Sequence, residues 1–206
     1  MTDGTPKSRT TKTKPRNVVA ALRTLSIDVA GDGPEQAIAW TCLGDADPVA
    51  LADQVARAIA AGIELPAPET CATLMLSDDA NVRILNKQWR GMDKPTNVLS
   101  FPMQVPPGAQ GGGPLEIGDI IVAEETLVRE AAEMGISAND HFRHLVLHGL
   151  LHLLGYDHEN DDEAEVMETL ETRILATLGV ADPYAGSDPI GHDGQAAHIS
   201  RDERPQ

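Results

Sequence analysis

Two histidines, His148 and His152, lie four positions apart in a strongly apolar stretch of the chain. On an α-helix this spacing places both imidazoles on one face, about one turn apart. Gly155 can end such a helix in a left-handed turn because it has no Cβ to clash, and the chain could then bring His158 back toward the same face. Three neutral imidazoles arranged in this way are typical of a site for a divalent metal, with zinc favoured and a fourth position open to water. An open position is typical of a catalytic metal site rather than a structural one.

The residue after the first of these histidines limits the chemistry. Zinc peptidases of the H-E-x-x-H type carry their general base, a glutamate, directly after the first histidine. Here that position is Gly149, which has no side chain. Peptide hydrolysis is therefore disfavoured, although another carboxylate could substitute for the missing base.

Other polar residues in the same region are expected to support the site. Asp157 precedes His158 and is a candidate to hydrogen-bond a metal ligand. His144 and His141 fall one and two turns before His148. Because a helix cannot bend three consecutive turns onto one ion, we expect these two histidines to line a groove or form hydrogen bonds.

The composition indicates one domain in a reducing compartment. The chain has 206 residues, of which 41% are hydrophobic and only 3% are aromatic. Its two cysteines, Cys42 and Cys71, are isolated from each other in sequence, which favours the cytoplasm over an oxidising compartment. No apolar run is long enough to span a bilayer, and the first 16 residues lack the apolar core of a secretory signal. We therefore predict a cytoplasmic protein that does not interact with membranes.

The net charge of −16 is unusual for a protein that handles nucleic acid. Five of the 16 basic residues lie within the first 16 positions. A second basic group, here called the basic strip, follows i, i+4, i+7, i+11 spacing and consists of Arg83, Lys87, Arg90 and Lys94. From charge alone, a solvated helix face is the favoured interpretation and a groove for phosphates is the alternative.

Hydrophobic periodicity and turn residues predict an α+β fold. We expect strands over 25–30, 70–76, 96–101 and 115–122, the last broken at Gly118. Helices are expected over 49–61, from 77 or 78 to 89, over 124–134, from 137 or 139 through the first histidines, and from 161 or 162 to 178. The last helix should bury an apolar stripe formed by Val166, Leu170, Ile174 and Leu178. The expected architecture is a single mixed sheet of about four strands, with five or so helices around a central metal-binding helix, as in zincins.

The stretch from His148 to His158 resembles the signature of the YbeY family, the bacterial rRNA maturation factors with endoribonuclease activity. The resemblance continues in four further blocks and covers roughly residues 25–184. These blocks are Leu85 to Pro102, Gly118-Asp119-Ile120, Asp161 to Glu171 and Asp182-Pro183-Tyr184. We expect an endoribonuclease domain over 21–184, a disordered basic tail over 1–20 and a disordered C-terminal tail over 185–206, with a flexible Gly/Pro loop at 104–114.

The resemblance implies a role for individual residues. The family's three zinc-binding histidines fall on His148, His152 and His158, with one Zn²⁺ per chain, and its essential arginine falls on Arg90. His148 and Arg90 are thus the expected catalytic residues, and the basic strip becomes a substrate groove. The implied substrate is single-stranded RNA, above all the 3′ end of the 16S rRNA precursor. The implied partners are the ribosome or its small-subunit proteins, with ribosome quality control as a related task.

Several alternatives stay open at this point. The chain could be a zinc-dependent hydrolase of peptides or small molecules, or a ribosome-assembly factor that acts mainly by binding. For RNA, the attacking group could be a metal-bound hydroxide or the RNA's own 2′-OH. The general base could be His144, Asp157 or the hydroxide itself. The sequence predicts neither the cleavage position, nor the native metal, nor the oligomeric state.

Overall fold

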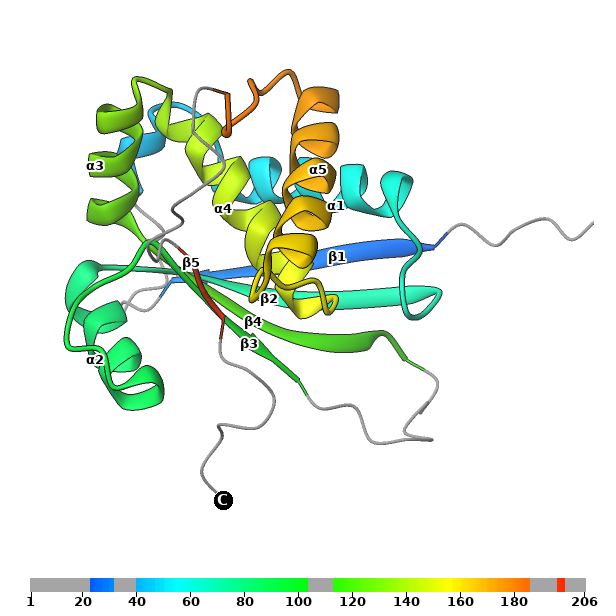
Figure 1. Ribbon diagram of the computed structural model, residues 1–206, viewed down its shortest axis with the longest axis horizontal. Coiled ribbons are helices and arrows are strands. Elements are labelled where there is room, and N and C mark those ends of the chain that lie inside the picture. Colours follow the sequence, from blue (N-terminus) through cyan, green and yellow to red (C-terminus); the bar gives the residue numbers. More distant parts are fainter. Residues whose placement is uncertain (1–22, 32–39, 104–112, 186–195, 199–206) are drawn as a thin grey trace, which may run out of the picture.

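One mixed β-sheet runs through the protein and carries helices on both faces (Figure 1). The structure, a computed structural model, describes residues 23–31, 40–103, 113–185 and 196–198. The elements in chain order are β1 (Thr24–Gly31), a 3-10 turn (Thr41–Leu43), α1 (Pro48–Gly62), β2 (Glu69–Ser77), α2 (Asp79–Arg90), β3 (Val98–Pro102), β4 (Leu115–Ala123), α3 (Glu124–Met134), α4 (Ala138–Leu153), α5 (Asp161–Thr177) and β5 (Ala196–His198). The predicted α+β class, the four predicted strands and the five predicted helices are confirmed.

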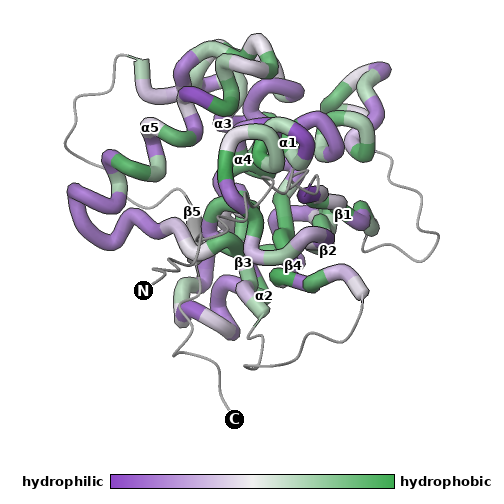
Figure 2. The backbone as a smooth tube through the Cα atoms, turned by 90° about the vertical axis from the view of Figure 1, so that its right-hand side faces the viewer, coloured by the Kyte–Doolittle hydropathy of each residue, from purple (hydrophilic) through white to green (hydrophobic). Residues whose placement is uncertain are grey.

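The strand order in the sheet is β1-β2-β4-β3-β5. Strands β1, β2 and β4 are parallel, β3 is antiparallel to β4, and β5 is parallel to β3. Helices α1, α3, α4 and α5 lie on one face, which we call the inner face, and α2 lies on the other, which we call the outer face (Figures 1 and 2). The main hydrophobic core fills the space between the inner face and its helices.

Helix α4 is the central element of the inner face, as predicted. It contacts β3, β4, α1, α3 and α5. Most of its residues from Leu145 to Leu153 are buried on every side of the helix. A helix that is apolar around its whole circumference is stable only when it is enclosed in this way. Any polar group between Leu145 and Leu153 is therefore held in a fixed environment.

Side-chain caps begin the helices that matter for the site. Asp78 accepts a hydrogen bond from the backbone N–H of Asn81 at 2.7 Å and caps α2. Ser137 accepts from the N–H of Asp140 at 3.1 Å and caps α4. These bonds satisfy N–H groups that the first turn of a helix leaves without partners. Asp78 and Ser137 are each one of the two alternatives that the sequence offered for these caps.

The predicted apolar stripe of α5 is partly wrong. Val166 is 57% exposed, while the next residue, Met167, is buried together with Leu170 and Ile174. One residue corresponds to about 100° around a helix, so the buried face of α5 is rotated from the predicted one. The rotation brings Glu171 onto the buried face.

Strand β4 does not break at Gly118, contrary to the prediction. The glycine has a φ of 136°, and a Cβ at this position would collide with the carbonyl oxygen of Phe101 on β3. The pairing of β2 with β4 shifts register between Cys71 and Thr73, and the strand then continues. Glycine here permits a close approach of two backbones, which is why the strand is continuous.

The predicted tails and loop lie largely outside the described residues. Beyond residue 185 the structure describes only the three residues of the short strand β5. They pair with β3, which would otherwise present unpaired backbone groups at the edge of the sheet. None of the helices in the described ranges combines the length and apolar composition needed to cross a membrane.

Candidate metal site

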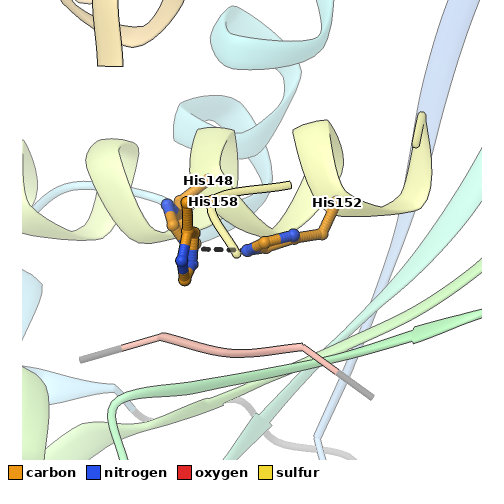
Figure 3. Close-up of side chains that lie close together, drawn as sticks. All are labelled: His148, His152 and His158. Atoms are coloured by element: carbon orange, nitrogen blue, oxygen red, sulfur yellow. Dashed lines mark hydrogen bonds between the residues drawn. The ribbon is translucent and has the colours of Figure 1, made fainter. Parts of the chain in front are cut away.

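Helix α4 and the turn that follows it bring three histidines together (Figure 3). His148 and His152 project from one face of α4, and Gly155 adopts a left-handed conformation with a φ of 93° just after the helix. The chain reverses there and returns His158 to the same place. One ligand nitrogen from each ring lies within 4.8 Å of the others. The structure thus brings together the three residues that the sequence selected.

Hydrogen bonds fix the two helical rings from behind. Nδ1 of His148 lies 2.8 Å from Oε1 of Glu171, and Nδ1 of His152 lies 3.1 Å from the backbone carbonyl oxygen of Tyr156. A carboxylate and a carbonyl can only accept, so in the neutral form of each ring the proton sits on Nδ1. Both Nε2 atoms are then left with bare lone pairs.

The charge state of this cluster follows from burial. Burial lowers the pKa of His148 and outweighs the attraction of Glu171, which acts in the opposite direction. Burial alone would raise the pKa of Glu171, but the interactions of the carboxylate with His148 outweigh burial and hold the pKa below its usual range. The site therefore pairs a neutral imidazole with an ionised carboxylate at neutral pH.

The residues present fit a divalent cation. The Nε2 atoms of His148 and His152 lie only 2.9 Å apart, and the dashed line in Figure 3 marks this contact. With both protons on Nδ1, no hydrogen is available between them and the two lone pairs repel. A cation bound to both nitrogens removes that repulsion, and His158 offers a third nitrogen. Three imidazoles suit zinc, copper, iron or nickel.

Three other polar residues on or just after α4 lie near the histidine group: His144, His141 and Asp157. Nε2 of His144 lies 3.6 Å from Oε2 of Glu171, and Nε2 of His141 lies 2.9 Å from Oε2 of Glu130. Neither histidine belongs to the group of three. His141 forms a hydrogen bond, whereas the His144 contact is longer than a hydrogen bond. Asp157 accepts a hydrogen bond from the N–H of His158 at 2.8 Å, and its Oδ1 is 3.9 Å from Nδ1 of His152. The nearer partner of that Nδ1 is the Tyr156 carbonyl.

Glu171 is a functional candidate that the sequence reasoning missed. The stripe was placed one residue away, so a glutamate on the buried face of α5 went unnoticed. The available signal was its spacing, since Glu171 follows Met167 by four positions and precedes Leu175 by four. An acidic residue between two apolar residues at this spacing lies on the buried face and needs a partner there.

The structure also explains why Gly149 replaces the peptidase glutamate. A Cβ at this position would lie 2.9 Å from Cγ2 and 3.1 Å from Cδ1 of Ile120, which is fully buried on β4. Helix α4 crosses the sheet at this point with no space for a side chain. A general base at this position is thus excluded by packing, and this observation weighs against a peptidase.

The basic strip lies on the outer face of the sheet. Arg90 is the exposed last residue of α2, so it lies on a helix on the opposite face of the sheet from α4, which carries His148 and His152 (Figure 1). Asp93 accepts hydrogen bonds from Nε of Arg83 and Nζ of Lys87, both at 2.7 Å. On the sheet side of α2, Leu85 is one of the residues that line an open cavity of about 350 Å³.

The chain is similar to known proteins over most of its length. The family described as endoribonuclease YbeY matches residues 45–179. The endoribonuclease YbeY of Bradyrhizobium diazoefficiens is 51% identical over 141 residues, which cover 68% of this chain and 77% of that protein. The protein of the same name from Rhodopseudomonas palustris is 48% identical over 155 residues, or 75% of this chain and 89% of that protein.

Among solved structures, the solution structure of TM1509 from Thermotoga maritima matches with a TM-score of 0.44 and 24% identity, over 80% of this chain and 99% of that chain. A likeness at this level does not extend to a comparison of sites. The match of the family to most of the chain, together with relatives about half identical to it, places the sequence securely. The chain belongs to the YbeY endoribonuclease family.

Proposed function

We propose that this protein is a zinc-dependent endoribonuclease that cleaves single-stranded RNA, with one Zn²⁺ bound by His148, His152 and His158. The observation that carries the proposal is the 2.9 Å approach of two imidazole nitrogens whose protons are both held on the opposite side of the ring. Membership of a family named for endoribonuclease activity supplies the reaction.

The bound ion would supply a water with a pKa near 7 and would polarise a phosphoryl oxygen. The chain's own residues prepare that site in two ways. Glu171 and the Tyr156 carbonyl hold the protons of His148 and His152 on Nδ1, which keeps both Nε2 atoms available as ligands. The turn after α4 adds His158 as the third ligand. Three protein ligands leave a position for water or a phosphate oxygen.

We assign Arg90 to the phosphate backbone of the substrate. Its planar guanidinium can pair two phosphate oxygens at once, which suits a group on which negative charge develops during cleavage. Since α2 and α4 lie on opposite faces, an RNA that meets both Arg90 and the histidines passes around an edge of the sheet. The remaining surface of a chain with net charge −16 repels RNA and confines binding to such a path.

The proposed substrate in the cell is the 3′ end of the 16S rRNA precursor, with the ribosome or small-subunit proteins as partners and the cytoplasm as the compartment. The resemblance of this chain to the YbeY family supports these assignments. The two free cysteines agree with a reducing compartment.

The proposal is tested by metal analysis beside a nuclease assay on the wild-type chain and on His152→Ala. We expect one zinc per wild-type chain, cleavage of single-stranded RNA and no cleavage of a peptide library. His152→Ala should lose both the zinc and the cleavage. RNA cleavage that persists in this variant after extensive chelation would show that the histidine site is not the catalytic centre.

Arg90→Ala tests the second residue. We expect cleavage to be abolished while the zinc content stays at the wild-type level. Arg57→Ala is the matched control, because Arg57 is an exposed arginine on α1 whose weak ion pair with Asp53 spans 3.8 Å. The 3′ ends of the products separate the two chemistries, since attack by the 2′-OH leaves a cyclic phosphate and attack by hydroxide does not.

A further inference from the structure

Glu171 is a fully buried carboxylate outside the sequence segment that holds the three histidines. It comes from α5, which packs against α4. An ionised carboxylate is costly to bury unless hydrogen bonds and opposite charge replace its water. The presence of Glu171 at 0% exposure therefore calls for strong and specific partners.

Those partners occupy both oxygens of the carboxylate. Oε1 accepts from Nδ1 of His148 at 2.8 Å, and Oε2 accepts from the hydroxyl of Tyr184. Nε2 of His144 is 3.6 Å from the same Oε2. Each oxygen thus has its own donor, and the plane of the carboxylate is fixed.

Tyr184 is itself held in place by a turn after α5. Oδ1 of Asp182 accepts from the backbone N–H of Tyr184 at 2.9 Å and from the hydroxyl of Thr172, on α5, at 3.0 Å. Burial and the nearby charge of Glu171 raise the pKa of Tyr184, so its hydroxyl keeps its proton and remains a donor. This turn lies beyond residues 45–179, where the family matches.

His148 and His152 differ in the group that accepts the hydrogen bond from Nδ1. The acceptor for His152 is the neutral carbonyl of Tyr156, whereas the acceptor for His148 is the carboxylate of Glu171. An anionic acceptor on Nδ1 orients the ring and makes Nε2 a stronger ligand. Nε2 of His148 should therefore be the stronger ligand of the two.

We propose that Glu171 and Tyr184 are positioning residues of the metal site: Glu171 holds the ring and the proton of His148, and Tyr184 holds Glu171. This inference rests on the proposed function and assigns a role to the Asp182–Tyr184 turn. A second cation between His144, His148 and Glu171, whose ligand atoms also lie within 4.8 Å of one another, is the competing interpretation. It is disfavoured because Nδ1 of His148 carries a proton and Oε2 of Glu171 already accepts from Tyr184.

The test compares zinc affinity and stoichiometry in four full-length proteins, measured by competition with a chromophoric chelator. These are the wild type, Glu171→Gln, Tyr184→Phe and Glu165→Gln. Glu165 is an exposed residue of α5, so Glu165→Gln makes the same chemical change at a matched control position. Glu171→Gln should bind zinc about 10- to 100-fold more weakly, which is the usual effect of losing such a partner. Tyr184→Phe should show a smaller loss, and Glu165→Gln none.

Two readouts separate positioning from general stability. A fifth protein, the double variant Glu171→Gln/Tyr184→Phe, should bind zinc as weakly as Glu171→Gln alone, because Tyr184 acts only through Glu171. The rise in Tm on adding zinc should shrink in Glu171→Gln and Tyr184→Phe, beyond any change in the Tm measured in chelator. Equal zinc affinity in Glu171→Gln and Glu165→Gln overturns the inference, as does a wild-type stoichiometry of two zinc ions that falls to one in Glu171→Gln.

The inference and the proposed function fail in different ways. A wild-type chain that binds no zinc removes the proposed metal site and this inference with it. A wild-type chain that binds zinc and cleaves RNA, with a Glu171→Gln variant of unchanged affinity, removes only the positioning role. If Glu171→Gln does not fold, Tyr184→Phe decides the matter, because unchanged zinc affinity in that variant contradicts the proposed chain of contacts.

Discussion

Glu171 and Asp93 are both acidic residues with two basic neighbours, but they lie in opposite environments. Glu171 is fully buried on the inner face between His148 and His144. Asp93 lies on the outer side, where its side chain is 45% exposed and pairs with Arg83 and Lys87. The number of partners is similar, so burial is the main difference between the two clusters.

Burial changes what such a cluster can do. In the interior, each partner is obligatory, since an unpaired charge there loses its hydration without compensation. At the surface, water and salt replace a lost partner at little cost. The inner face is accordingly suited to hold a few atoms in one arrangement, and the outer face is suited to adjustable contacts with a charged polymer.

The largest expected contrast between the faces concerns zinc. Saturating zinc should stabilise the wild-type protein by about 4 kcal/mol at a thousandfold excess over its Kd, because only the folded chain brings the three histidines together. His158→Ala should lose most of this gain, whereas Arg90→Ala, on the outer face, should keep it. Thermal unfolding with zinc and with chelator measures the difference for each protein.

An equal gain in His158→Ala and the wild type would contradict the assignment of the third ligand. A reduced gain in Arg90→Ala would show that the two faces are energetically coupled, and the comparison would then have to be abandoned.

The next largest effect is expected at Gly149. Gly149→Ala places a methyl group 2.9 Å from a fully buried isoleucine, and such overpacking typically destabilises a protein by about 1–3 kcal/mol. Gly62→Ala, on α1, is the matched control, because its Cβ would be at an ordinary 3.6 Å from Ile174. That variant should be neutral or more stable by up to about 1 kcal/mol, since alanine favours a helix over glycine. Urea titration of both variants makes the comparison.

A neutral Gly149→Ala would mean that α4 can move away from the sheet at little cost. The exclusion of a general base by packing at this position would then be lost, and the case against a peptidase would be weaker.

The sequence predicted the metal-binding histidines, but it did not predict the residues that hold them in place. The spacing of His148 and His152 and the glycine after them locate the metal group, because helix geometry alone relates these positions. Glu171 could not be paired with His148 in the same way. Their contact spans 23 positions and depends on how α5 is rotated about its axis against α4. The spacing of apolar residues in α5 predicted this rotation only to within one residue.

In the fold, too, local features could be predicted and long-range contacts could not. Local signals located the five helices and four of the strands, and the caps at Asp78 and Ser137 were among the predicted alternatives. The faces of the sheet were not predicted, and the interpretation of Arg90 depended on them. Which helix covers which face is decided by contacts between distant segments, and the spacing of residues within one helix carries no information on it.

The two cysteines offer a third test of the comparison between the faces, because one lies on the inner side of the sheet and the other on the outer side. Cys42 packs against the inner core, where burial and Glu124 raise its pKa to about 12. Cys71 points to the outer side of β2, where burial and Glu116 raise its pKa to about 11. A raised pKa lowers the thiolate fraction, so at pH 8 both thiols should react slowly with iodoacetamide, and Cys42 more slowly than Cys71.

Mass spectrometry of tryptic peptides after timed alkylation measures the two rates. Both rates should rise with pH and become similar in urea, where the folded environment is lost. Cys42 alkylating faster than Cys71 in the native protein would reverse the expected order of the two sides.

The smallest effect is expected for Asp93→Asn on the outer face. Hydrogen bonds from Lys87 and Arg83 lower the pKa of Asp93, so the ionised form is the one that the folded state favours. Its contribution is therefore complete above the unfolded pKa of about 3.9 and is lost as the pH falls below that value. At neutral pH, the unfolding midpoint of Asp93→Asn in urea should differ only slightly from that of the wild type. The difference should disappear at about 1 M NaCl, where exposed charges are screened. A large loss that persists in high salt would show that the cluster around Asp93 behaves like the one around Glu171, and burial would no longer explain the contrast between them.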